Sequence, residues 1–230
     1  MGPSLDGAGA VPGSFSINQH QVKTTMPNRF KTALLLGAPG SGKGTQGKIL
    51  GRIPGYFHCA CGDVFRNLDI HSELGKIFYE YSSRGELVPD DVTVRMWHQS
   101  IQSRCATHEY KPNSDLLILD GIPRTLEQAQ MMDDLVEIYA VVHLVCEDEE
   151  AMIDRLRRRA VKENRADDAD ENVIRNRWKV YEAETKPVLD HYNEEIIYQV
   201  NAVQSPARVL HDVLEVVTPI QESHFAKFMG

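Results

Sequence analysis

The chain has few cysteines, and they do not form the pattern of a metal-binding or disulfide framework. Its 230 residues include four, at Cys59, Cys61, Cys105 and Cys146, and no two of them make a CxxC pair. The Cys59-Ala60-Cys61 spacing is also poor for a zinc knuckle. We therefore expect free thiols in a reducing cytoplasm and no structural zinc.

Long apolar runs and an excess of positive charge are missing as well. No run approaches the ~20 apolar residues that a membrane helix needs, so we expect no membrane segment. The net charge of −8 disfavours a nucleic-acid-binding surface, because such proteins usually carry a basic excess. Arginines nevertheless cluster between 155 and 177, which leaves room for a local anion site in an acidic protein.

Both ends of the chain lack the periodic apolar pattern of a packed core. Residues 1–29 are rich in Gly, Pro and Ser, which predicts a disordered or loosely docked extension. This segment also lacks the basic start and apolar middle of a signal peptide, in agreement with a cytoplasmic protein. We expect one domain over 30–218 and a C-terminal tail over 219–230.

A glycine-rich stretch at 37–46, with the sequence GAPGSGKGTQ, is the strongest signal in the chain. It follows the apolar run 33–36 and leads into a helix-competent segment, which is the context of a phosphate-binding loop. Glycines let successive N–H groups turn inward, the helix adds its positive end, and Lys43 adds a mobile charge. Because Gly44 follows the lysine, the usual hydroxyl comes from Thr45. The loop predicts a site for a nucleoside triphosphate.

Strand and helix patterns alternate along the remainder of the chain. Such alternation predicts an α/β fold with a doubly wound, five-stranded parallel sheet flanked by helices. The predicted strands are 33–36, 56–59, 116–119, 139–145 and 196–200. The predicted helices after the loop begin near 61 and 72, then span about 90–102 with Asp90 as N-cap, 148–159, 171–192 and 207–217. The helices between about 61 and 102 have no strand among them, which predicts a helical insertion.

Charged residues gather where the predicted strands end. Asp120-Gly-Ile-Pro-Arg124 follows a buried strand, and an open α/β sheet places its ligands at that end. Phosphoryl transfer needs positioning and dense positive charge. Six arginines fit that need: Arg66, Arg124, Arg155, Arg159, Arg165 and Arg177. A solvated helix face is the simpler interpretation of three others, Arg157, Arg158 and Arg175.

Five motifs together resemble the adenylate kinase family of nucleoside monophosphate kinases. They are GAPGSGKGT at 37–45, Gly62-Asp63 with Arg66, DGIPR at 120–124, Arg155 with Arg159, and RADD at 165–168. They occur in the family's order, and the similarity runs from about Lys31 to Val217. The resemblance implies a core, a helical monophosphate-binding insertion at about 60–90, and a short lid at about 159–170 without zinc.

The resemblance also implies roles for individual residues. ATP would be bound by Gly40, Ser41, Gly42, Lys43, Gly44, Thr45, Arg155, Arg159 and Gln204. AMP would be bound by Cys61, Arg66, Glu86, Leu87, Val88, Gly121, Ile122, Pro123, Arg124, Gln128, Arg165 and Arg177. The catalytic set would be Lys43, Asp120, Arg124, Arg159, Arg165 and Arg177. Thr45 and Asp120 would hold Mg²⁺, with Asp120 acting through water.

Three departures from the family pattern bear on specificity. Cys61 stands where adenylate kinases usually carry threonine and the pyrimidine-specific relatives tend to carry alanine. Gln204 occupies a position that is often glycine, at the expected contact with the ATP base. The segment between Arg165 and Arg177 is one residue longer than usual.

The resemblance implies an ATP-dependent nucleoside monophosphate kinase that makes two ADP from ATP and AMP with Mg²⁺, and we expect a monomer. A UMP/CMP kinase is the alternative that Cys61 allows and Gln128 disfavours. A P-loop regulatory protein without kinase activity is a second alternative, against which the intact Lys43, Asp120 and Arg124 weigh. A P-loop GTPase is disfavoured because no Asn-Lys-x-Asp motif is found.

Overall fold

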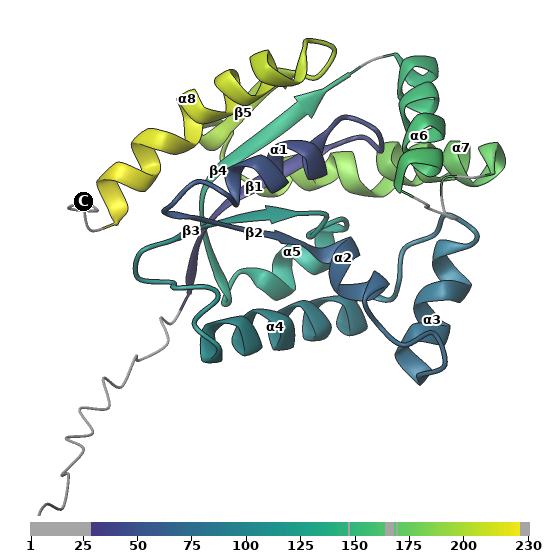
Figure 1. Cartoon of the computed structure of the whole chain (residues 1–230), viewed down its shortest axis with the longest axis horizontal. Helices are drawn as coiled ribbons and strands as arrows, with labels where there is room; N and C mark the ends of the chain where they lie inside the picture. The colour runs from purple at the N-terminus through teal and green to yellow at the C-terminus, as the bar shows by residue number, and fades with distance from the viewer. Residues whose placement is uncertain (1–28, 147, 164–167, 169, 226–230) are drawn as a thin grey trace, which may run out of the picture.

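The computed structural model describes residues 29–146, 148–163, 168 and 170–225 (Figure 1). Strands alternate with helices along these ranges. The strands are β1 Phe30–Gly37, β2 Tyr56–Ala60, β3 Leu116–Asp120, β4 Val136–Val145 and β5 Ile197–Asn201. The α-helices are α1 Lys43–Leu50, α2 Cys61–Arg66, α3 Glu73–Ser82, α4 Asp90–Ala106, α5 Leu126–Met132, α6 Glu149–Glu163, α7 Glu171–Val180 and α8 Pro206–His224. The predicted N-terminal extension lies outside the described residues, except for Arg29.

The sheet confirms the predicted fold class. Its five strands are parallel and stand in the order β2-β3-β1-β4-β5. The first strand is therefore central: Leu35 pairs with Asp120 on one side and with Val142 on the other. This order places the loop after β1 between the carboxyl ends of its two neighbours, which is where such sheets bind ligands.

Two different sets of helices cover the two faces of the sheet. Side chains alternate along a strand, so successive residues of β1 enter different cores. Leu34 and Leu36 belong to the core that includes Trp97 of α4, whereas Leu35 belongs to the core that includes Val213 of α8. Figure 1 shows α8 on one side of the sheet and α4 and α5 on the other.

The helical insertion between β2 and β3 is present as α2, α3 and α4. Ser72 caps α3, since its hydroxyl accepts a hydrogen bond from the Gly75 N–H at 3.0 Å. The predicted capping role of Asp90 is wrong. Pro89 occupies the N-cap position of α4, and Asp90 Oδ1 instead accepts a hydrogen bond from the side-chain amide of Gln128 at 2.7 Å.

Helices near the predicted lid differ in length from the prediction. α6 continues to Glu163, so residues 159–163 form its last turn, and residues 164–167 and 169 lie outside the described ranges. The single helix predicted over 171–192 is instead α7, a π-helical turn (η2, Tyr181–Thr185) and a 3₁₀ helix (η3, Lys186–His191), followed by a short 3₁₀ turn (η4, Glu194–Ile196). Pro187 has no N–H to donate, so the α-helical ladder cannot continue through it.

The last helix is longer than predicted, and the predicted start of the tail at 219 is wrong. α8 runs through Pro219 to His224, and Phe225 is only 6 % exposed within the core under α8. Lys31 secures this end, because its ammonium donates to the His224 carbonyl at 2.9 Å. Burial of Phe225 therefore holds the last turn to the domain. No helix among the described residues has the length and apolar character needed to cross a membrane.

Replacing Phe225 tests this boundary. Phe225→Ala should lower the free energy of unfolding by about 3 kcal/mol, because deleting a buried aromatic ring loses its transfer energy and leaves a cavity. Urea denaturation measures the change. Val161→Ala is the matched control, since Val161 is 88 % exposed, and it should change stability by no more than about 0.5 kcal/mol. Equal stabilities for the two variants would place Phe225 outside the folded core.

Candidate active site

A cavity of about 760 Å³ opens at the carboxyl ends of the strands and contains most of the predicted site residues. The predicted residues that line it are Gly40, Ser41, Gly42, Lys43, Gly44, Thr45, Cys61, Arg66, Glu86, Leu87, Val88, Asp120, Gly121, Pro123, Arg124, Gln128, Arg155, Arg159, Arg177 and Gln204. Arg165 lies outside the described residues. Ile122 was predicted to line the cavity, but its side chain is fully buried in the core beneath it.

The glycine-rich loop has the geometry of an anion cradle. Gly42 precedes α1 with φ +101°, a conformation that favours glycine, and no side chain caps the helix. The first-turn N–H groups of a helix have no partner within it, so the start of α1 presents donors to the cavity. Ser41 Oγ is buried without a hydrogen-bond partner, which a bound phosphate oxygen would supply.

Close backbone packing holds this loop in place. A Cβ added at Gly37 would lie 2.6 Å from the Leu144 carbonyl oxygen of β4, and one at Gly40 would lie 2.9 Å from the Met152 carbonyl oxygen of α6. Both glycines also have positive φ values. Any larger residue would push the loop away from β4 or α6, so these glycines fix its position against two elements.

Lys43 is the central charge of the cavity. Its ammonium donates to the carbonyl oxygens of Gly37 at 2.6 Å and Ala38 at 3.0 Å. Burial lowers the pKa of Lys43 to about 8, and the positive charges of Arg124, Arg159 and Arg177 act in the same direction, while Asp120 opposes them. Positive charge is therefore in excess around Lys43, which is the arrangement that a polyanionic ligand would neutralise.

Asp120 ends β3 inside this positive field. Burial acts to raise its pKa, but the His58 imidazole and the Lys43 ammonium outweigh it, so the pKa is lowered and the carboxylate stays ionised. The His58 Nε2 atom lies 3.8 Å from Asp120 Oδ2. A Cβ at Gly44 would lie 3.6 Å from the same oxygen, so the first turn of α1, with the exposed Thr45, is close to the carboxylate. Carboxylate and hydroxyl oxygens of this kind suit Mg²⁺.

A buried carboxylate organises two of the predicted catalytic arginines. Asp168, which is 1 % exposed, accepts a hydrogen bond from Arg159 Nε at 2.7 Å and pairs through its other oxygen with Arg177. The resemblance assigned no role to Asp168. Its two oxygens bring arginines from α6 and α7 together at one wall of the cavity.

Another group of lining residues, here called an arm of the cavity, contains the predicted acceptor residues Arg66, Arg124, Gln128 and Cys61. Arg66 pairs with Asp63 one turn earlier in α2. The Arg124 side chain donates through Nε to the Gly121 carbonyl at 2.9 Å. The backbone N–H of Arg124 donates to Gln128 Oε1 at 2.7 Å. Gln128, which is 1 % exposed, thus joins the Arg124 backbone to Asp90 of α4. This link holds the segment that carries Arg124.

The neighbouring thiol of Cys61 is neutral at physiological pH. Cys61 is buried at the start of α2, and burial raises the pKa of its thiol to about 12. It lines the same arm as Arg66 and Gln128. The side chain therefore offers the cavity a weak S–H donor rather than a thiolate.

Sequence reasoning missed several residues that line the cavity. Arg158, predicted on a solvated face, is exposed but also lines the cavity, as does Lys162 one turn later. Their spacing from Arg155 and Arg159 on one helix face was the available signal. Arg157 and Arg175 form ion pairs with carboxylates at the surface. This agrees with the prediction that they lie on a solvated helix face.

Comparison with known proteins identifies the family. The adenylate kinase family model matches residues 35–197. The chain belongs to the adenylate kinase family. Adenylate kinase from Flavobacterium psychrophilum is 34 % identical over 191 residues, covering 80 % of this chain and 96 % of that protein. The adenylate kinase of Thermobifida fusca is 38 % identical over 195 residues (82 % and 92 %), and that of Corynebacterium diphtheriae is 39 % identical over 168 residues (71 % and 87 %).

The lowered pKa of Lys43 predicts proton uptake when MgATP binds. With a pKa of about 8 in the free protein, Lys43 is charged below pH 7 and loses its proton as the pH rises through 8. Bound phosphates favour the ammonium form, so binding at pH 8.5 should take up part of a proton, whereas binding at pH 6.5 should take up almost none. Calorimetry in buffers of different ionisation enthalpy measures this number. The same uptake in Lys43→Met would exclude Lys43 as its source.

Proposed function

We propose that this adenylate kinase family member transfers the γ-phosphate of ATP to AMP, giving two molecules of ADP, with Mg²⁺ bound beside the phosphates. The observation that carries the proposal is one continuous cavity, whose lining joins the phosphate loop to two groups of residues, here called its arms. One arm contains Arg155 and Gln204, and the other contains Cys61 and Gln128. A donor and an acceptor nucleotide can therefore meet over Lys43.

The donor occupies the arm nearer to α8. Its triphosphate lies along the loop 40–45 and receives the N–H groups at the start of α1 and the charge of Lys43. The base lies toward Ala202, Gln204 and Val209, where Arg155 is held by its hydrogen bond to the Ala202 carbonyl at 2.9 Å. This arrangement lets a guanidinium plane stack on the base.

The acceptor occupies the arm beside the helical insertion. Arg66 and Arg124 bind its phosphate, and the base lies toward Cys61, Val88 and Gln128. The side chain of Gln128 retains one amide N–H and one oxygen lone pair beyond its bonds to Asp90 and Arg124. These groups can bind the edge of adenine.

Phosphoryl transfer between two bound phosphates needs positioning and charge stabilisation rather than a general base, because the attacking phosphate oxygen is already ionised. Lys43, Arg159 and Arg177 surround the place where the two phosphate chains meet. They stabilise the negative charge that develops on the transferred group. Asp168 keeps Arg159 and Arg177 in position before the ligands arrive.

Thr45 and Asp120 would hold Mg²⁺, with Asp120 acting through water. The ion supplies positive charge to the donor phosphates and fixes their geometry. The ionised state of Asp120 and its place near the start of α1 support this assignment. From the family pattern, we also propose that Arg165 acts on the transferred phosphate together with Arg159 and Arg177. We further propose that the protein acts as a monomer in the cytoplasm.

Removing the charge of Lys43 tests the catalytic proposal. Lys43→Met should lower kcat by roughly 10²-fold or more, the range expected when one stabiliser of transition-state charge is lost. ADP production from MgATP and AMP measures it, and thermal denaturation shows whether the variant folds. Lys111→Met is the matched control, since Lys111 is exposed and does not line the cavity, and it should remain near wild-type activity. A folded Lys43→Met protein with normal turnover would contradict the assigned role.

Acceptor choice distinguishes AMP kinase from UMP/CMP kinase. We expect AMP to have the highest kcat/KM among AMP, dAMP, UMP, CMP and GMP. Cys61→Thr should lower the KM for AMP, because a hydroxyl is a stronger hydrogen-bonding group than a thiol. Gln128→Ala should reduce the use of AMP most, through the lost base contact and the loosened link to Arg124. A higher kcat/KM for UMP or CMP than for AMP in the wild-type protein would favour the alternative function.

A further inference from the structure

A buried hydrogen bond joins the central sheet to the helical segment that carries Arg177. His143 of β4 is 7 % exposed, and its Nε2 atom lies 2.9 Å from the Tyr181 hydroxyl oxygen. Tyr181 is equally buried and begins the π-helical turn η2, which follows α7 directly. The two residues are 38 apart in the sequence, so the bond is a tertiary contact that fixes the start of η2 against the sheet.

Each end of this bond is next to a part of the catalytic site. Within the sheet, His143 pairs with Leu36 of β1, which directly precedes the glycine-rich loop. At the other end, the Tyr181 backbone N–H donates to the Arg177 carbonyl oxygen, one turn earlier, and the Tyr181 side chain lines the cavity. The bond therefore connects the backbone of Arg177 to the strand beside the phosphate loop.

Two contacts thus hold Arg177 from different directions. Its guanidinium pairs with Asp168, which also binds Arg159 of α6. Its backbone is held through Tyr181 to His143 of β4. The first contact sets where the end of the side chain lies, and the second sets where its helix lies relative to the sheet. A charge held in this way needs little rearrangement when negative charge develops beside it.

Both partners of the buried bond are uncharged at physiological pH. Burial lowers the pKa of His143, and the charges of Lys186 and Lys43 act in the same direction. Burial raises the pKa of Tyr181 to about 12, with a smaller contribution from Glu182. A neutral imidazole and a phenol each have a hydrogen to donate and a lone pair to accept. The contact therefore holds the two elements together without adding charge to a cavity that is already positive.

Stability alone does not account for a histidine at this place. Its Nδ1 atom is buried and has no hydrogen-bond partner in the described part of the chain. Burying such an atom costs free energy, whereas an apolar side chain would avoid that cost. The neighbours of His143 in the strand, Val142 and Leu144, are apolar and fully buried. A polar contact kept at an energetic cost is expected where it positions a functional group.

We propose that His143 is a positioning residue for phosphoryl transfer: through the Tyr181 hydroxyl it holds the start of η2, and with it Arg177, at a fixed place relative to the phosphate loop. The inference rests on the proposed function, since it takes Arg177 as a stabiliser of the transferred group. Such a charge acts mainly in the transition state. Loss of the contact should therefore lower the rate of the chemical step more than it weakens substrate binding.

Tyr181→Phe removes only the hydroxyl and tests this contact. The rate of the chemical step with MgATP and AMP should fall by about tenfold, the value of one hydrogen bond, while both KM values stay near those of the wild type. Rapid-quench kinetics measure this rate apart from product release. His143→Leu should have the same effect. His143→Gln should retain most of the rate, because a glutamine amide nitrogen can occupy the place of Nε2.

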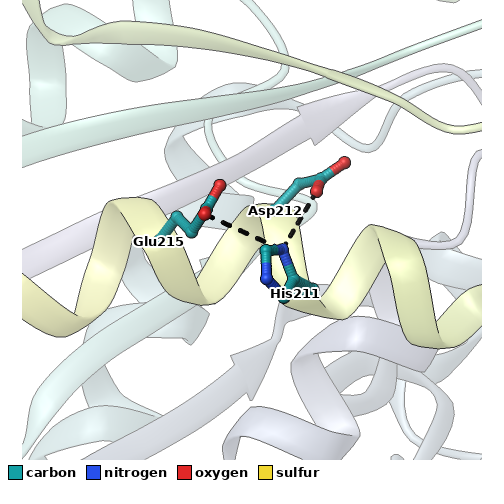
Figure 2. A group of neighbouring side chains, drawn as sticks. All are labelled: His211, Asp212 and Glu215. Atoms are coloured by element: carbon teal, nitrogen blue, oxygen red, sulfur yellow. Dashed lines mark hydrogen bonds and ion pairs between the residues drawn. The ribbon is translucent and has the colours of Figure 1, made fainter.

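His211→Leu is the matched control, since it also replaces a histidine that has polar partners. Figure 2 shows His211 between Asp212 and Glu215 on α8, and its Nδ1 atom lies 3.3 Å from an Asp212 oxygen. His211 is exposed and does not line the cavity. This change should leave the rate of the chemical step and both KM values unaltered.

Two double variants separate positioning from a structural effect. His143→Leu with Tyr181→Phe leaves neither partner unpaired, so thermal stability should return toward that of the wild type while the chemical step stays slow. In an Arg177→Ala background, Tyr181→Phe should cause no further loss, because the contact acts through Arg177.

Three results would overturn the inference: a normal rate in a folded Tyr181→Phe protein, a rate that recovers with stability in the first double variant, or a full additional loss in the Arg177→Ala background. A wild-type protein that makes no ADP from ATP and AMP would instead overturn the proposed function.

Discussion

Concentrated positive charge around one loop is the constraint on which the site depends. Lys43, Arg124, Arg159 and Arg177 face a common space. Burial lowers the pKa of Lys43 to about 8; Asp120 opposes this shift, and the three guanidinium charges add to it. Two kinds of contact offset the repulsion among these charges in the folded protein. Buried carboxylates pair with the cations, and the glycines of the loop let backbone carbonyl oxygens accept from Lys43. The remaining positive charge favours a polyanionic ligand.

The same kind of hydrogen bond occurs in both arms of the cavity. At each end a glutamine amide is oriented by an aspartate from a neighbouring helix: Gln128 by Asp90 at 2.7 Å, and Gln204 by Asp212 at 2.8 Å. The consequences differ because the burial differs. Gln128 is almost fully buried and also binds the Arg124 backbone, so it supports the acceptor segment. Gln204 is half-buried, and its amide nitrogen donates to Asp212 and to the Asn201 carbonyl oxygen.

Much of the fold followed from local pattern. Apolar runs located the strands, their alternation with helices predicted the parallel sheet, and the spacing of the glycines and Lys43 predicted the loop. The predictions were wrong where contacts between residues far apart in the sequence determine the structure. Asp90 has the composition of a cap, but Gln128, 38 residues later, draws its carboxylate away. Likewise, residues after 218 look like a tail until Phe225 is seen buried beneath α8.

The sequence by itself determined the chemistry of the phosphate loop, because strand, glycines, lysine and helix start are consecutive and their geometry is local. It also supplied the arginines, but not their arrangement. Only the tertiary structure showed that Asp168 joins Arg159 to Arg177, that Ile122 points into the core, and that Asp212 fixes the amide of Gln204. Such contacts join separate elements, and their distances are set by how helices pack on the sheet rather than by any spacing along the chain.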